Sequence, residues 1–156
     1  MATQWTAGLT AGSVLNASTL NTLGAASETF TPTWTAATTN PTLNNGILSG
    51  RYFRINKMVF CQIYLQIGST TNVGNGQYRW ALPLTASSPI ASFLTIGPGR
   101  YFDSSAGTAY LANVIFNGGI TTYVSLYIAS QILSSTGPVV PATGDEYHLS
   151  FWYEAA

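Results

Sequence analysis

Three residues near the C-terminus, Asp145, Glu146 and His148, have side chains that could bind a metal ion or transfer protons. On an extended strand Glu146 and His148 share one face about 7 Å apart, because successive side chains point to opposite faces. A metal ion would need a third ligand, which Asp103 or Glu154 would have to supply. The alternative, which we favour, is a polar turn that begins the last strand, with His148 on its less buried face.

Other catalytic motifs are missing or incomplete. The sequence contains no Gly-x-Ser-x-Gly turn of the kind that positions a serine nucleophile. Residues 97–100, GPGR, are a poor phosphate-binding loop because Pro98 lacks an N–H and no helix follows, so we interpret them as a turn. Paired carboxylates for glycoside hydrolysis are also scarce in the folded part: Asp103, Asp145, Glu146 and Glu154. We predict no catalytic activity, cofactor or metal, and retain an enzyme that degrades envelope sugars as an alternative.

The 156-residue chain is poor in charge. Five Lys or Arg and five Asp or Glu residues make up 6% of the sequence and leave no net charge, whereas about 25% is usual. Nucleic-acid binding needs many cations on one face, and the one cluster, Arg51, Arg54 and Lys57, is split between the two faces of a strand. We expect no nucleic-acid partner. The apolar surplus is easiest to place in interfaces between subunits.

Two further features bear on where the protein is made. No Lys or Arg precedes Arg51, so the basic start of a secretory signal is missing. Residues 104–144 carry no charge but are interrupted throughout by Gly, Ser, Thr, Asn and Pro, so they do not form a membrane span. We expect synthesis in a cytoplasm and no insertion into a membrane.

Cys61 is the one cysteine, and we interpret it as a small buried hydrophobic residue.

The longest regular pattern lies between Gly46 and Thr71. It predicts a hairpin whose tight turn is Asn56-Lys57. In the second strand an apolar face alternates with a partly aromatic face. The first face carries Val59, Cys61, Ile63, Leu65 and Ile67, and the second carries Phe60, Gln62, Tyr64 and Gln66. We expect one face to fill the core and the other to fill an interface between copies.

From Phe30 onward the pattern is that of β-strands throughout. We predict eight strands, at residues 30–35, 46–55, 57–67, 77–82, 90–96, 108–116, 121–132 and 146–153. Their lengths, joined by both tight hairpins and long loops, predict an all-β fold: an antiparallel jelly-roll-like β-sandwich rather than an up-and-down barrel. The connections near 83–89 and 133–145 would cross between its sheets. We predict one such domain, residues 30–156.

Residues 1–29 differ from the rest and predict a short N-terminal helical or extended arm. Asn16 can cap a helix of about two turns that starts at Ala17 and stops at Gly24. So short a helix is unstable alone in water, so we expect order only when it docks. It would dock either on the protein's own domain or trimer axis, or on another protein. Docking would bury Trp5, Leu9, Val14, Leu15, Leu20 and Leu23.

The first half of the chain carries a series of short motifs. They comprise Ala11-Gly12, Val14-Leu15, Ala17, Leu20-Asn21, Leu23, the runs 30–35, 50–55 and 68–71, Asn45-Gly46, Lys57, Val59, Leu65, Gly74, Gly76 and Leu82-Pro83. Together they resemble bacteriophage virion proteins of the minor tail or fibre type, although Asn56 stands where glycine is usual. The resemblance implies a structural protein of the virion, made in the bacterial host cytoplasm. It also implies a homotrimer whose N-terminal arm attaches to a tail, baseplate or capsid protein.

Binding of a host-surface glycan is the alternative function. Loops 68–76, 97–107 and 133–145 are the surfaces that could recognise a receptor, because loops carry binding residues on a rigid scaffold. We place candidate receptor contacts at the tip of the second loop, at Tyr101, Phe102 and Asp103. Packing is the competing interpretation for four aromatic residues: Trp80, Tyr101, Tyr110 and Trp152.

Overall fold

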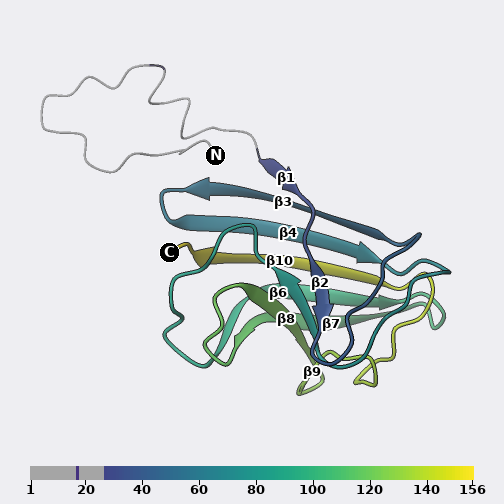
Figure 1. Cartoon of the computed structure of the whole chain (residues 1–156). Coiled ribbons are helices and arrows are strands. Elements are labelled where there is room, and N and C mark those ends of the chain that lie inside the picture. Colours follow the sequence, from purple (N-terminus) through teal and green to yellow (C-terminus); the bar gives the residue numbers. More distant parts are fainter. Residues whose placement is uncertain (1–16, 18–26) are drawn as a thin grey trace, which may run out of the picture.

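The structure, a computed structural model, describes Ala17 and residues 27–156, and every element named in it is a β-strand (Figure 1). The prediction of an all-β fold is confirmed for this part of the chain. The predicted arm lies outside the described residues, apart from Ala17 and the segment from Ser27. The strands are β1 (Glu28–Phe30), β2 (Trp34–Ala36), β3 (Ile47–Ile55), β4 (Met58–Gln66), β5 (Tyr78–Ala81), β6 (Phe93–Asp103), β7 (Thr108–Asn117), β8 (Tyr123–Ile128), β9 (Gln131–Ile132) and β10 (Glu146–Glu154).

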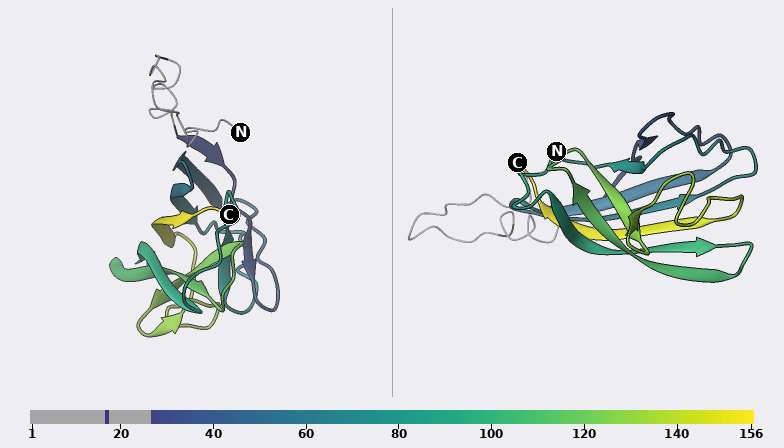
Figure 2. Two further views of the ribbon diagram at one scale, coloured as in Figure 1. Left: turned by 90° about the vertical axis from the view of Figure 1, so that its left-hand side faces the viewer. Right: turned by 90° about the horizontal axis from the view of Figure 1, so that it is seen from below.

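The ten strands form one curled antiparallel sheet. Their order is β1-β3-β4-β10-β6-β7-β8-β5-β2, and β9 pairs with β8. β1 and β2 stand at opposite ends of this order, yet only residues 31–33 separate them in the chain. The sheet must therefore curl until its two ends approach each other, and Figures 1 and 2 show this curl.

The sheet turns a corner at β8. Its first residues, Tyr123 and Val124, pair with β5, whereas Ser125 and the next two residues pair with β7. A strand that changes partner along its length turns a corner between two parts of a sheet. β5 and β2 are thereby carried over to face the inner side of the long strands.

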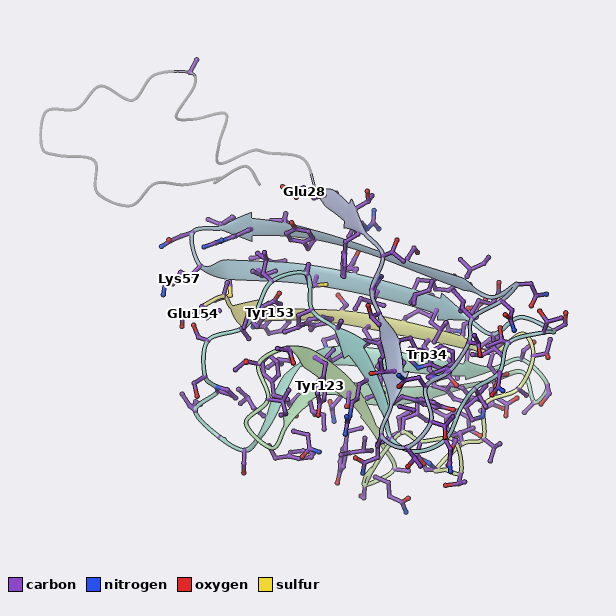
Figure 3. All side chains as sticks on the ribbon, in the orientation of Figure 1. Glu28, Trp34, Lys57, Tyr123, Tyr153 and Glu154 are labelled. Carbon is purple, nitrogen blue, oxygen red and sulfur yellow. The ribbon has the colours of Figure 1, made fainter. Side chains whose placement is uncertain are left out.

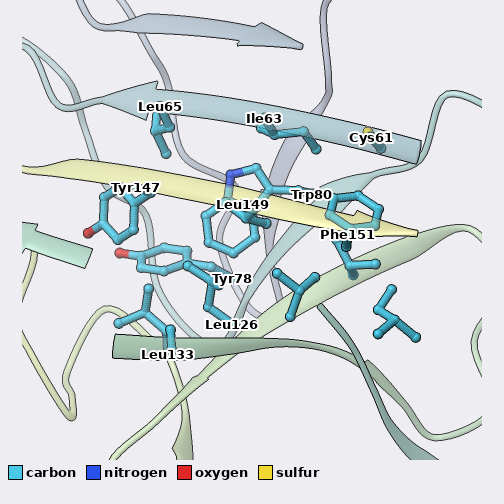
Figure 4. Packing of buried hydrophobic residues seen from close by; sticks show 14 of the residues in the cluster. Cys61, Ile63, Leu65, Tyr78, Trp80, Leu126, Leu133, Tyr147, Leu149 and Phe151 are labelled. Atoms are coloured by element: carbon cyan, nitrogen blue, oxygen red, sulfur yellow. The ribbon is translucent and has the colours of Figure 1, made fainter. Parts of the chain in front are cut away.

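The core lies inside the curl. Figure 4 shows Tyr78 and Trp80 of β5 among the inward side chains of β4 and β10, and the ring centroids of Trp80 and Tyr147 are 6.0 Å apart. The predicted apolar face of β4 is buried here. Cys61 belongs to that face, and burial raises the pKa of its thiol to about 12, so it acts as a small apolar residue.

The predicted hairpin at the centre of the pattern is confirmed. β3 pairs with β4 along its whole length, and Ile55 faces Met58 across the two-residue turn. Asn56 in that turn has a φ of 53°, a left-handed conformation that asparagine adopts more readily than most residues.

Two predicted strands are each divided in the structure. The strand expected at 30–35 is split into β1 and β2 around Pro32, which cannot donate a ladder hydrogen bond. The strand expected at 121–132 is split into β8 and β9 by a turn at Ala129 and Ser130. Both turn residues have positive φ, 48° and 66°, the combination found in two-residue type I′ hairpins.

Residues 97–100 lie within a strand, so their interpretation as a turn is wrong. They form the middle of β6, next to a shift of register between Thr95 and Gly97. Pro98 follows this bulge, one of the few places where a sheet accommodates proline. A Cβ atom at Gly97 would lie 2.3 Å from the Ser150 carbonyl oxygen, so glycine allows β6 to approach β10 closely.

Two of the long connections, which lie near the predicted crossings, join strands that are not neighbours in the sheet. Residues 82–92 lead from β5 to β6, and residues 133–145 lead from β9 to β10. Among the described residues there is no helix with the length and apolar character needed to cross a bilayer.

Candidate functional site

The buried Asp145 carboxylate joins separate segments of the chain through hydrogen bonds. It accepts hydrogen bonds from the Tyr101 hydroxyl (2.5 Å) and from the backbone N–H groups of Ala142 (2.7 Å) and Ser104 (3.0 Å). These bonds tie the connection before β10 to the end of β6 and its following turn. Because Asp145 has no exposed surface, it has no access to a substrate.

Glu146 and His148 lie on the outward side of β10, as alternation predicted. Their side chains contact each other, with 3.2 Å between Glu146 Oε2 and His148 Nε2. The His148 ring also lies against Tyr64 of β4, with ring centroids 4.9 Å apart. The pair is therefore part of a side-chain cluster on the surface of the sheet.

Neither candidate third metal ligand reaches this pair. Asp103 ends β6, where hydrogen bonds from the Ala106 N–H and the Ser105 hydroxyl of the following turn hold its carboxylate and lower its pKa. Glu154 lies at the opposite end of β10, and Figure 3 shows it near Lys57 of the β3–β4 hairpin. Within the described part of the chain, no group of three or more His, Cys, Asp or Glu side chains could hold a metal ion.

The candidate receptor contacts do not lie at a loop tip, so that placement is wrong. Tyr101, Phe102 and Asp103 are the last residues of β6 and pair with β7. Tyr101 is completely buried, and burial together with its hydroxyl bond raises its pKa well above the usual range. Phe102 and Asp103 are partly exposed. Packing is confirmed for Tyr101 and Trp80, whereas Trp152 is 51% exposed.

The predicted attachment residues fall outside the described part of the chain, so their role stays a prediction. They are Trp5, Leu9, Val14, Leu15, Leu20 and Leu23. The structure does describe where the chain enters the fold. Ser27 lines a groove on the outside of the sheet, and Glu28 begins β1 and accepts a hydrogen bond from the Tyr52 hydroxyl (2.8 Å).

We use the term outer face for the outward side chains of β3, β4, β10 and β6. Strand pairing places Phe53, Phe60 and Trp152 side by side on this face, and the Phe53 and Phe60 rings stack with centroids 4.7 Å apart. These rings line a groove of about 400 Å³, the apolar groove. Of the ten large exposed apolar residues in the described part of the chain, six lie on the β3, β4 and β10 part of this face: Ile47, Phe53, Ile55, Met58, Phe60 and Trp152.

A second, larger depression lies beside the apolar groove. It has a volume of about 750 Å³, and we call it the polar trough. Thr29 of β1 and Arg51 of β3 line one end and Arg100 of β6 lines the other, with Tyr64 and His148 between them on β4 and β10. Tyr64 faces His148 across the sheet, and His148 faces Arg100. The trough therefore extends over five neighbouring strands, β1, β3, β4, β10 and β6.

A row of three side chains separates the two depressions and lines both. Arg51, Gln62 and Ser150 are direct neighbours on β3, β4 and β10. Arg51 Nε donates a hydrogen bond of 2.9 Å to Gln62 Oε1, which orients the guanidinium along the sheet. The row therefore divides an aromatic end of the outer face from a polar end.

The polar trough carries an excess of positive groups. Neither Arg51 nor Arg100 forms an ion pair with a carboxylate within the described part of the chain. The Arg100 guanidinium lies 4.9 Å from the centroid of the Phe102 ring. The trough thus presents two guanidinium groups to whatever occupies it.

Sequence reasoning did not identify the polar trough. Alternation correctly placed Phe60 and Tyr64 on the second face of their strand. The trough depends on β10 lying between β4 and β6, and no motif in the sequence indicates that pairing. The only available signal was the isolated cluster of cations that contains Arg51.

Comparisons of the chain with protein-family models, curated proteins and solved structures found no match.

Proposed function

We propose that the protein is a non-enzymatic structural component of a bacteriophage virion that assembles as a trimer and attaches to the particle through its N-terminal arm. The observation that carries self-association is the apolar groove with the neighbouring apolar residues of the β3–β4 hairpin. Phe53, Phe60 and Trp152 are exposed side by side, and Ile55 and Met58 extend the apolar surface to the end of the hairpin. Clustered apolar surface of this kind marks a contact site.

A second copy of the chain is the occupant that this surface favours. Interface cores contain few charged residues and many aromatic ones, and buried aromatic side chains contribute most of the binding energy. Arg51 is the single charged residue that lines the apolar groove, and it lies at the border. A chain that is only 6% charged has correspondingly apolar surfaces to offer its own copies.

The finer parts of the proposal are supported by the sequence resemblance. The motifs at 30–35, 50–55 and 68–71 resemble minor tail and fibre-type proteins, which implies a trimer, a virion location and attachment by the arm. We further propose that the curled sheet is a jelly-roll-like sandwich. The connections 82–92 and 133–145 support this proposal because each joins strands that are not neighbours.

Self-association can be tested by placing a charge in the apolar groove. Phe60→Asp should convert the trimer to a monomer in sedimentation equilibrium at micromolar concentration, because the interface would then bury an unpaired carboxylate. Ile90→Asp is the matched control, since Ile90 is 95% exposed and lies outside the groove. A Phe60→Asp protein that stays folded and trimeric would place the interface elsewhere.

Attachment can be tested separately by deleting residues 1–27. We expect the shortened protein to remain a folded trimer that no longer joins the virion. Loss of the trimer would instead mean that the arm belongs to the subunit interface.

Binding of a host-surface glycan is the second candidate function. The polar trough favours it, because binding sites are depressions that combine aromatic side chains with a few polar groups. We place this candidate function on the outer face rather than at Tyr101, because Tyr101 is buried.

A further inference from the structure

We propose that the polar trough binds an acidic oligosaccharide, a short chain of sugars that carry carboxylate groups. This inference rests on the second candidate function, glycan binding, and identifies its site and ligand class. It does not depend on self-association, because the rings of the apolar groove lie on the other side of the row formed by Arg51, Gln62 and Ser150.

The charge of the ligand follows from the two arginine residues. Neither Arg51 nor Arg100 has a carboxylate partner among the described residues, and a guanidinium group binds carboxylates through a planar pair of N–H donors. The hydrogen bond to Gln62 orients Arg51, and the ring of Phe102 lies beneath the Arg100 guanidinium. Both cations are therefore positioned by contacts that leave their charge unneutralised.

The sugar rings of the ligand match the middle of the trough. Tyr64 is partly exposed there, and its ring lies against that of His148 at a centroid distance of 4.9 Å. An aromatic face packs against the apolar side of a sugar ring, and neighbouring hydroxyl and amide groups can bond sugar hydroxyls. Ser49, Gln62 and Ser150 line the same trough and supply such groups.

The dimensions favour a short chain over a single sugar. Three strand intervals separate β3, which carries Arg51, from β6, which carries Arg100, and they correspond to about 14 Å. Its volume of about 750 Å³ lies within the usual range for ligand sites. Nucleic acid does not fit this site, because two guanidinium groups on a chain of zero net charge cannot neutralise a polyphosphate backbone.

The test is a calorimetric titration of the full-length protein in 50 mM salt with tri-galacturonic acid. The fully methyl-esterified trisaccharide serves as the neutral analogue with the same rings, and sodium acetate serves as the isolated carboxylate. We expect the acid to bind and both the ester and acetate to bind about tenfold more weakly or worse. Arg51→Gln and Arg100→Gln should each weaken binding of the acid about tenfold.

Two controls separate a change at the site from a change in folding. Arg79→Gln should leave the affinity unchanged, because Arg79 lies over the Tyr123 ring, 4.8 Å from its centroid, and outside the trough. Thermal unfolding of each variant should match that of the unchanged protein. Tyr64→Leu should weaken binding of both the acid and its ester, since it removes the ring without changing charge.

Each of the following results would overturn the inference, and each has a different consequence. Unchanged affinity in the Arg51→Gln/Arg100→Gln double variant would place acidic-glycan binding elsewhere and leave the glycan function standing. Acetate binding as tightly as the trisaccharide would reduce the trough to a simple anion site. Absence of binding by both trisaccharides would remove the ligand assignment. Absence of signal on an array of other neutral and acidic glycans would remove the glycan function as well.

Discussion

Replacing Asp145 with alanine should lower the free energy of unfolding by about 3 kcal/mol. The substitution leaves three donors without their acceptor: the Tyr101 hydroxyl and the N–H groups of Ser104 and Ala142. The hydroxyl is completely buried, so its loss of a partner costs about 1–3 kcal/mol. The two N–H groups form partly buried hydrogen bonds, and water can replace the lost acceptor. We therefore expect each to contribute about 0.5–1 kcal/mol to the loss of stability.

A double-mutant cycle isolates the buried hydrogen bond. Tyr101→Phe removes the hydroxyl but leaves the carboxylate its two backbone donors, so we expect a smaller loss of about 1–2 kcal/mol. In the Asp145→Ala/Tyr101→Phe variant no hydroxyl is left without a partner. The combined loss should therefore fall short of the sum of the single losses by about 1 kcal/mol or more.

The assay is urea unfolding at pH 7, followed by tryptophan fluorescence at one protein concentration, because association also contributes to stability. Asp103→Ala is the matched control. Asp103 bonds only within the turn at Ser105 and Ala106, so its loss should cost at most about 1 kcal/mol. A loss under about 0.5 kcal/mol for Asp145→Ala, or strict additivity in the cycle, would refute the role of this carboxylate in joining separate segments of the chain.

Three further predictions concern stability. Gly97→Ala should cost at least about 2 kcal/mol in urea unfolding, because its Cβ would collide with the backbone of β10; an unchanged midpoint would contradict the close approach. Ala129→Asn combined with Ser130→Gly should add about 1 kcal/mol, since both residues have positive φ, and a lower melting temperature would contradict that turn geometry. The free energy of unfolding should fall between pH 9 and 12. Burial raises the pKa of Cys61 from 9.0 and that of Tyr78 from 10.0, each to about 12. The folded protein therefore binds more protons than the unfolded chain in that pH range, so raising the pH favours unfolding. Cys61→Ala should remove the part of this loss that begins near pH 9, as measured by urea unfolding at each pH.

The local structure of the sheet could be predicted from the sequence because alternation is a local property. The face that carries Val59 and Cys61 is buried, and the face that carries Phe60 and Tyr64 points outward, as predicted. The turn at Asn56 was likewise identified from residues beside it. In both places the residue pattern lies within a few residues of the strand or turn that it predicts.

The arrangement of the strands could not be predicted, because it depends on contacts between distant segments. The polar trough needs Arg51 and Arg100 on one surface, and only the placement of β10 between β4 and β6 brings them there. Gly97 and Pro98 predict a turn because turns and bulges use the same residue types, and the structure has a bulge here. The predicted turn puts Tyr101 at a loop tip, whereas its ring packs inside the curl.

The central claim is that apolar surface on the outer face joins copies of this chain. The molar mass of the full-length protein, measured by analytical ultracentrifugation at micromolar concentration in 0.1 M and 1 M salt, tests it most directly. We predict three times the chain mass of 16.6 kDa in both solutions, because an apolar interface is insensitive to the screening of charge. A mass of 16.6 kDa in either solution would contradict the claim.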